Sequence, residues 1–161
     1  EHVRSYAKHK ANRSEVFNLT EVIRRAINSI NKEEIEGVHT SENLPDEAMA
    51  VGDSFEIELA VLNILKNALK AAKNSLNPQT SVSVTAQKHM WKITITDNGP
   101  KISEEIFSAL GRPTSTSKKD GLGVGLSIVL SIIENNGGHL TFRRIEPNGI
   151  AVDLFVKKKE E

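Results

Sequence analysis

The stretch DGLGVGLSIVLSIIENNGG, residues 120–138, places glycines at positions 121, 123 and 125 directly before a helical pattern rich in leucine and isoleucine. A glycine costs roughly 1 kcal/mol relative to alanine inside a helix, so this spacing indicates that a bare backbone is needed there. The free N–H groups and the positive dipole end of a first helical turn form an anion site, from which side chains would keep a phosphate away. A flexible turn before a buried helix explains this stretch alone equally well.

Two common phosphate-binding motifs are excluded by their spacing. A dinucleotide-binding loop requires G-x-G-x-x-G after a strand, and here the third glycine comes one residue too early. The motif G-x-x-x-x-G-K-[ST] does not occur in the chain. If the glycines hold a phosphate, they do so in another fold.

The composition limits the class of protein. The length of 161 residues suits one domain with a sizeable core, and the equal counts of 21 basic and 21 acidic residues give no overall field that would recruit nucleic acid or a membrane surface. The absence of cysteine excludes disulfides and thiolate metal sites and suits a reducing compartment. No apolar run approaches the roughly 18 residues of a membrane span. We therefore expect a soluble, cytoplasmic fragment of a longer protein.

The order of elements predicts an α+β fold. Strands that alternate in period 2 are mostly linked by hairpins in the second half, while long helices are few. This favours a two-layer α/β sandwich, in which helices cover one face of a mixed, mostly antiparallel sheet. The expected strands are 16–19, 35–42, 47–52, 81–87, 91–97, 139–145 and 149–156, and the expected helices are 20–30 capped by Thr20, 53–75 started by Asp53 and Glu56, 103–110, and the glycine-led helix that ends at Gly137 and Gly138.

The flanks of this domain differ in composition from its body. Residues 1–13 are basic and lack an apolar stripe, so we interpret them as the end of an upstream helix followed by a linker. The globular domain is expected to span residues 14–157, and residues 158–161 form a charged tail.

The helix 53–75 carries an unusual polar stripe. At about 100° per residue its apolar side chains fill one arc, and the opposite side carries Asn63, Asn67, Lys70 and Asn74. Asparagine is a poor helix former, an asparagine carbonyl can ligate Mg²⁺, and a lysine can meet a phosphate. An ordinary solvated face is the alternative. The expected buried arc is Ile57, Val61, Ile64, Leu65, Ala68, Leu69 and Ala72.

The segment ITDNGP, residues 95–100, places a carboxylate at the end of an apolar strand. Asp97 could accept a hydrogen bond from an exocyclic amine, and Gly99 would let a flat ring approach the backbone. A simple Asp-Asn-Gly turn is the alternative.

The three signals occur in a fixed order that resembles a known family. Asn-x-x-x-Asn-Ala on a helix, Asp-x-Gly after a strand and Gly-x-Gly-x-Gly-Leu opening a helix resemble the N, G1 and G2 boxes of the ATP-binding domain shared by sensor histidine kinases, Hsp90-type chaperones, type II topoisomerases and mismatch-repair ATPases (the GHKL superfamily, with the Bergerat fold). The resemblance covers about residues 14–157. It implies ATP and Mg²⁺ as cofactors.

The resemblance also implies roles for single residues. Asp97 would bind the adenine amine, Asn67 would hold Mg²⁺, and Asn63 and Lys70 would lie near the phosphates. The backbone at the three glycines would form a lid hinge and wrap the triphosphate. The implied ATP site comprises Asn63, Asn67, Lys70, Asp97, Gly99, Lys101, Thr116, Ser117, Lys118, Gly121, Leu122, Gly123, Val124, Gly125 and Leu126.

The branch of the family follows from the chemistry of the helix motif. ATP-hydrolysing members look like Glu-x-x-x-Asn-x-x-Asp-Ala, whereas this chain has Asn63 at the general-base position and Lys70 at the aspartate position. Without that base a water nucleophile is poorly activated, so the phosphoryl group is expected to pass to another acceptor. The run NALKAA and the T-S-K at 116–118 are similar to the histidine-kinase form, in which Lys118 or Lys119 would reach the γ-phosphate. A solvated basic loop is the alternative.

The chain departs from the family pattern at three positions. Lys101 replaces the second glycine of the usual D-x-G-x-G, and it would narrow the base pocket or place a cation near the nucleotide. The usual aromatic-rich segment before the lid is reduced to Phe107, and Ala151 stands where Thr or Ser is frequent.

No phospho-acceptor is evident in the chain. None of its five histidines, at 2, 9, 39, 89 and 139, lies in a His-acid pattern on an amphipathic helix. The expected function is the catalytic domain of a two-component sensor histidine kinase, which acts on a histidine of upstream dimerisation helices in a homodimer and relays to a response regulator. The alternatives are a serine kinase of the anti-sigma type and a degenerate nucleotide-responsive binding module.

Overall fold

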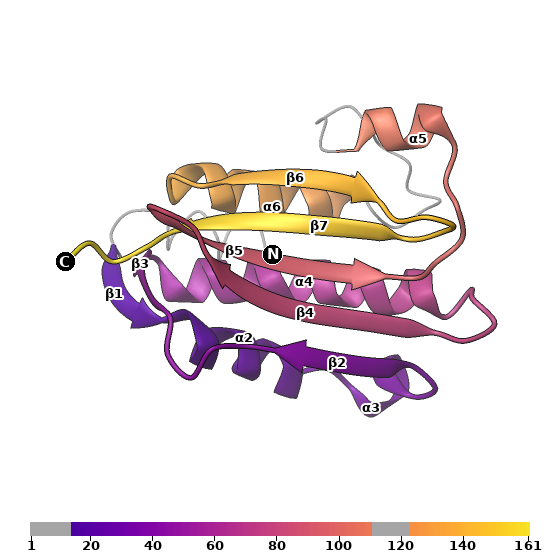
Figure 1. Ribbon diagram of the computed structural model, residues 1–161, viewed down its shortest axis with the longest axis horizontal. Coiled ribbons are helices and arrows are strands. Elements are labelled where there is room, and N and C mark those ends of the chain that lie inside the picture. The colour runs from indigo at the N-terminus through magenta and orange to yellow at the C-terminus, as the bar shows by residue number, and fades with distance from the viewer. Residues whose placement is uncertain (1–13, 111–122) are drawn as a thin grey trace.

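The computed structural model describes residues 14–110 and 123–161, and it has the two layers expected from the sequence (Figure 1). A five-stranded sheet has the order β2-β4-β5-β7-β6, in which β2 runs parallel to β4 and the other neighbours are antiparallel. Helices α2, α4 and α6 lie on one face of this sheet, and α5 lies beyond the end of β6 and β7. The α+β sandwich is confirmed.

The bounds of the elements agree closely with the hydrophobic pattern. The strands are β1 (Glu15–Asn18), β2 (His39–Asn43), β3 (Met49–Gly52), β4 (Gln79–Ala86), β5 (Met90–Asp97), β6 (His139–Arg144) and β7 (Ile150–Lys157). The helices are α2 (Leu19–Asn28), α3 (Lys32–Ile35), α4 (Ser54–Ala72), α5 (Glu104–Ala109) and α6 (Gly123–Asn135).

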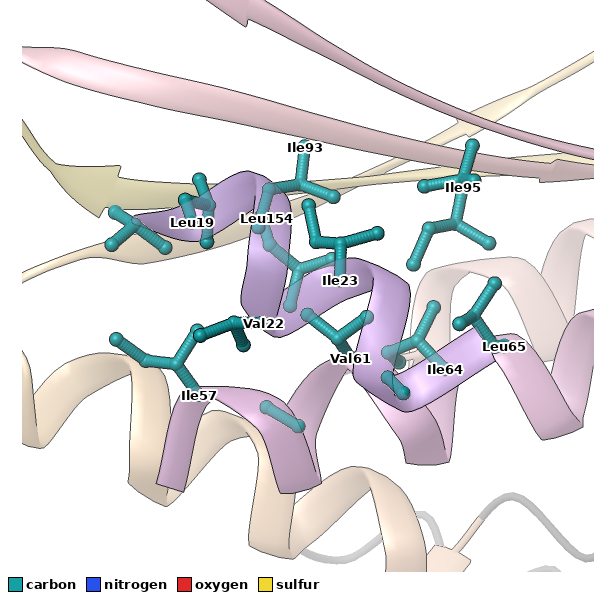
Figure 2. Close-up of a cluster of buried hydrophobic side chains, with 14 of the residues drawn as sticks. Leu19, Val22, Ile23, Ile57, Val61, Ile64, Leu65, Ile93, Ile95 and Leu154 are labelled. Atoms are coloured by element: carbon teal, nitrogen blue, oxygen red, sulfur yellow. The ribbon is translucent and has the colours of Figure 1, made fainter. Parts of the chain in front are cut away.

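The core lies between α4 and the centre of the sheet (Figure 2). Ile93 and Ile95 alternate with Thr94 along β5, so the isoleucines face the helices and the threonine faces the open side of the sheet. Figure 2 shows these isoleucines and Leu154 of β7 gathered with labelled side chains of α2 and α4. The arc predicted on α4 is confirmed, because all its members are buried: Ile57, Val61, Ile64, Leu65, Ala68, Leu69 and Ala72.

The prediction that Thr20 caps the first long helix is wrong. The helix begins at Leu19, and its N-cap is Asn18, whose Oδ1 accepts from Thr20 N at 3.1 Å and from Ala48 N at 3.0 Å. The Asn18 carboxamide oxygen satisfies two backbone donors at once, one of them distant in sequence. The buried Thr20 hydroxyl is then free to donate to Pro45 O at 2.9 Å.

The predicted strand 35–42 begins four residues too early. Ile35 belongs to the short helix α3 and is its last residue. This helix forms because Asn31 caps its beginning in a capping box that includes Glu34. Gly37 follows with φ +81°, and β2 begins only at His39. The strand β3 pairs with β1 in a separate two-stranded sheet.

The start of α4 at Asp53 is confirmed, but only half of the expected capping box forms. Asp53 Oδ1 accepts from Glu56 N at 3.1 Å, as predicted. The backbone N–H of Asp53 donates at 2.8 Å to Oδ1 of Asn136, just beyond α6, instead of to Glu56. Asn136 Nδ2 in turn donates to Glu56 Oε1 at 3.0 Å. One carboxamide thus ties the end of α6 to the beginning of α4.

The expected charged tail is partly paired with the strand β3. Lys158 forms an isolated β-bridge with Ala50, and Lys159 N donates to Met49 O at 3.0 Å.

Within residues 14–110 and 123–161, no helix combines the length and the apolar character that crossing a membrane requires.

Candidate functional site

A cavity of about 330 Å³ lies between α4 and the ends of β5, β6 and β7 that face α5. It brings together four residues of the implied ATP site, Asn67, Lys70, Asp97 and Leu126, and it also includes Asn74 of the polar stripe. The remainder of the wall is almost entirely apolar: Ile64, Ala68, Ala71, Ile95, Pro100, Ile102, Ile106, Leu110, Phe142, Ile150 and Val152. A cavity of this size and character, with few polar groups, is typical of a small-molecule site.

Asp97 ends β5 and places its carboxylate in this cavity. Burial among apolar side chains raises the pKa of Asp97, while hydrogen bonds from the backbone N–H groups of Gly99 and Ile150 act in the opposite direction. No ion pair within the described part of the chain includes this carboxylate. Asp97 is therefore a partly buried acceptor without a cationic partner among the described residues.

The turn after Asp97 is held tightly against α4. Gly99 N donates to Asp97 Oδ1 at 2.8 Å. A Cβ on Gly99 would lie 2.9 Å from the Cβ and the O of Ala71 and from Asp97 Oδ1, so no side chain fits. Close packing against Ala71 therefore requires glycine at position 99. The sequence alone suggests a different reason, namely that glycine leaves room for a flat ring. This close contact of the turn with the helix fixes the position of the carboxylate.

The loop between β6 and β7 supports the same turn from the other side. Asn148 Nδ2 donates to Asn98 O at 2.6 Å and to Gly99 O at 3.0 Å. Gly149 has φ +110°, and a Cβ there would overlap the backbone oxygen of Asp97. Sequence reasoning missed both residues as parts of the site. The signal that could have found them is the Pro-Asn-Gly turn at 147–149, which places an amide and a glycine next to a strand end.

Asn63 lies on the same helix as Asn67 but does not line the cavity. Its Nδ2 donates to Leu59 O at 2.9 Å, one turn earlier. Its Oδ1 is directed toward the first turn of α6, where it is 3.6 Å from the position that a Cβ on Gly125 would occupy. The beginning of the glycine-led helix therefore lies beside the polar stripe of α4.

Gly125 differs from the other glycines of the site region. An added Cβ would make only ordinary van der Waals contact with its described surroundings, and the backbone is not in the left-handed region. The fold, so far as it is described, would accept alanine at this position. Leu126, the next residue, is buried and lines the cavity.

Several expected site residues lie elsewhere or outside the described residues. Lys101 is exposed and does not line the cavity, although Pro100 and Ile102 on either side of it do. Phe107 is also absent from the wall and lies under the guanidinium of Arg144 instead. Outside the described residues lie Thr116, Ser117, Lys118, Lys119, Gly121 and Leu122, and of Gly123 and Val124 only the helical backbone is described.

Within the described ranges, no group of three or more His, Cys, Asp or Glu side chains could hold a metal ion. The cavity wall does include the Asn67 amide, whose oxygen is the kind of ligand that Mg²⁺ takes.

Comparisons with known proteins agree with this geometry. A family model described as histidine kinase-, DNA gyrase B-, and HSP90-like ATPase matches residues 52–160. The C4-dicarboxylate transport sensor protein DctB of Rhizobium meliloti (strain 1021) is 33% identical over 114 residues, which cover 71% of this chain and 18% of that protein. Sporulation kinase B of Bacillus subtilis (strain 168) is 27% identical over 149 residues, which cover 92% of this chain and 35% of that protein. The chain thus spans about a third or less of these relatives.

Solved structures share the fold. A mycobacterial sensor histidine kinase, MprB, superposes with a TM-score of 0.79 at 24% identity, over 92% of this chain and all of that chain (100%). The catalytic domain of the histidine kinase ThkA in a nucleotide-free form superposes with a TM-score of 0.80 at 24% identity, over 91% of this chain and 97% of that one. At these identities the likeness concerns the arrangement of helices and strands.

The raised pKa of Asp97 predicts a pH dependence of stability. Because the folded chain holds the carboxyl proton more tightly than the unfolded chain, whose value is near 3.8, the contribution of Asp97 to stability is greatest below that value. It is lost as the pH rises through the raised pKa. The free energy of unfolding of the wild type, minus that of Asp97→Asn, should therefore fall as the pH rises from about 4 to about 7, measured by urea denaturation.

The exposed Asp46 offers a matched control, because Asp46→Asn removes one carboxylate from the surface. The same trend for Asp46→Asn would show that the loss of any carboxylate produces this pH dependence, whatever its position. A difference for Asp97→Asn that grows with pH would contradict the assignment of a desolvated carboxylate.

Proposed function

The chain belongs to the histidine kinase-, DNA gyrase B- and HSP90-like ATPase family, and we propose that it is the ATP-binding catalytic domain of a two-component sensor histidine kinase. The observation that carries the proposal is the partly buried Asp97 carboxylate, which faces a mostly apolar cavity without a cationic partner among the described residues. Such an acceptor matches the exocyclic amine of an adenine ring, whose faces would contact the surrounding isoleucines. A hydrogen bond to that amine would satisfy the carboxylate.

The phosphates of ATP would lie along α4 toward the beginning of α6. Lys70 lines the cavity, and Asn63 lies beside Gly125. Since the described surroundings do not require glycine at position 125, the bare backbone is better explained by a ligand, and free N–H groups at a helix beginning suit phosphate oxygens. The same role is proposed for Gly121, Gly123 and the neighbouring Leu122, Val124 and Leu126. Thr116, Ser117 and Lys118 would complete the site from the preceding segment.

The cation that accompanies ATP would be Mg²⁺, held by the side-chain oxygen of Asn67. Mg²⁺ keeps several waters and commonly takes only one or two protein ligands besides phosphate oxygens, so a single amide in the cavity fits its chemistry. The ion would neutralise charge on the phosphates during transfer.

The reaction proposed is phosphoryl transfer to an imidazole. A histidine nitrogen attacks the γ-phosphorus, the bond from that phosphorus to the β–γ bridging oxygen breaks, and ADP leaves with the bond electrons. Asn63 stands where the hydrolytic relatives carry a glutamate, and an amide cannot take a proton from water. The chain thus favours transfer over hydrolysis.

The acceptor is proposed to lie on dimerisation helices upstream of Glu1. The histidines within the described residues are exposed and none lines the cavity: His39, His89 and His139. The domain at 14–157 would then act within a homodimeric, cytoplasmic kinase module and pass the phosphoryl group to a response regulator. The relatives favour this function over an anti-sigma-type serine kinase, and the placement of Lys101 outside the cavity wall removes the reason to expect a blocked, degenerate site.

Incubation with γ-labelled ATP tests the proposed reaction. The isolated chain should bind Mg-ATP, release phosphate very slowly and remain unlabelled, because it has no hydrolytic base and no placed acceptor. With its own upstream dimerisation helices added in trans, it should give an acid-labile, base-stable label on a histidine there. Rapid phosphate release by the chain alone would favour the ATPase branch, and an acid-stable label on the partner would favour serine kinase activity.

The metal role of Asn67 is tested by calorimetric titration with ATP in the presence and absence of Mg²⁺. Asn67→Ala should remove the Mg²⁺ dependence of ATP affinity, whereas Asn67→Asp should keep or strengthen it. Asn74→Ala, seven residues further along the chain and also in the cavity wall, is the matched control and should retain the dependence. An unchanged Mg²⁺ response in Asn67→Ala would contradict the assignment.

A further inference from the structure

The helix α5 forms part of the cavity wall although little holds it there. Ile106 of α5 and Leu110 directly after it line the cavity. No residue of α5 is buried, and Ile106 itself is 41% exposed. A helix of 6 residues has little stability of its own, so apolar burial and helix propensity do not fix its position.

The polar contacts of α5 with the rest of the described chain converge on Arg144, the last residue of β6. Arg144 Nη2 lies 2.6 Å from Glu104 Oε2 in the first turn of α5. The guanidinium of Arg144 also lies 4.7 Å from the centre of the Phe107 ring, one turn further along. The Arg144 side chain therefore contacts α5 at two residues one turn apart, through an ion pair with Glu104 and a cation–π contact with Phe107.

The two consecutive arginines of β6, Arg143 and Arg144, point to opposite faces of the sheet and have different partners. Arg143 points to the open face of the sheet, where Nε and Nη2 bind the two oxygens of the buried Asp153 at 2.7 and 3.0 Å. Because side chains alternate along a strand, Arg144 points to the opposite face, the one that carries the helices. Its side chain is only 26% exposed. Its Nε and Nη2 are buried without a hydrogen-bond partner among the described residues, so the contacts of Arg144 with α5 are the ion pair and the ring contact.

Arg144 is a neighbour, in the sheet, of residues that form the strand part of the cavity wall. It pairs with Ile150 across the hairpin and is two residues from Phe142, and both of these side chains line the cavity. Arg144 itself does not line it. The Arg144 side chain therefore links β6, which contributes Phe142 to the cavity wall, with α5, which contributes Ile106.

We propose that Arg144 is a positioning residue that holds α5 against the sheet and thereby sets the affinity of the cavity for nucleotide. The inference rests on the proposed function, since it takes a nucleotide as the occupant. The ion pair is largely exposed on the Glu104 side, and a cation–π contact is modest in size. Loss of both contacts should weaken nucleotide binding by about fivefold to tenfold, because the wall must then be ordered when the ligand binds.

Calorimetric titration with ADP tests the proposal on the whole chain. Arg144→Gln should raise the dissociation constant by about fivefold to tenfold, and Glu104→Gln should raise it by a smaller factor. The double variant should bind no more weakly than Arg144→Gln, because both changes break the same contact. Arg144→Lys should recover part of the affinity by restoring the charge without the planar stacking. The control is Glu105→Gln, an exposed neighbour in the same helical turn, which should bind as the wild type does.

A thermal unfolding midpoint measured without nucleotide separates positioning from general stability. Since α5 contributes no buried residue, Arg144→Gln should keep the midpoint within about 2 °C while its ADP affinity falls. A lower affinity together with a large fall in the midpoint would overturn the proposal in favour of a structural role. Equal ADP affinities of wild type and Arg144→Gln would overturn this inference alone. An absence of ADP binding by the wild type would overturn the proposed function and this inference together.

Discussion

The contact between the Asp97–Gly99 turn and α4 is the constraint on which the rest of the structure depends. Gly99 leaves no room for a Cβ against Ala71, so the end of β5 and the last turns of α4 cannot separate or shift without losing this fit. The hairpin of β6 and β7 closes on the same turn through Asn148 and Gly149. A helix, a strand end and a hairpin thus meet around one carboxylate. The cavity is the space that this junction leaves between the layers.

The fold supports a carboxylate in an environment that opposes its charge. Asp97 lines a cavity whose wall is mostly isoleucine, valine and leucine, and its described hydrogen-bond donors are two backbone N–H groups. An ionised carboxylate in such surroundings lowers the stability of the ligand-free protein and favours a ligand that carries a hydrogen-bond donor. Binding sites commonly have groups that lower stability in this way. Asp153 shows the opposite arrangement on the open face of the sheet. There Arg143 and Thr94 bind the carboxylate and hold the pKa of Asp153 below its ordinary value despite burial. One sheet therefore carries an aspartate with an arginine partner on one face and, on the other, an aspartate that has only backbone donors among the described residues.

Local patterns in the sequence predicted the elements and the polar centre of the site, whereas contacts between distant segments were not predictable. The period of α4 identified its buried arc, and the strand–turn pattern at Asp97 identified the carboxylate, because both depend on nearby residues. Thr20 was mistaken for a helix cap because the oxygen that competes for the donors, Asn18 Oδ1, also bonds to Ala48 across the fold. The sequence could not distinguish the apolar wall of the cavity from the hydrophobic core, because isoleucines that face a cavity and isoleucines that face a helix recur with the same period along a strand. Arg144 carried no signal, since its partners on α5 lie about 40 residues earlier in the chain.

The central claim is that Asp97 recognises the adenine amine, and an equilibrium titration with ADP, compared between the wild type and Asp97→Asn and repeated with GDP, tests it most directly. The account predicts that the wild type binds ADP in clear preference to GDP. It also predicts that Asp97→Asn binds ADP about 5- to 150-fold more weakly, because the amine then faces an amide that offers it a poorer acceptor. Equal affinities of the two proteins for ADP, or no preference of the wild type for ADP over GDP, would contradict the account.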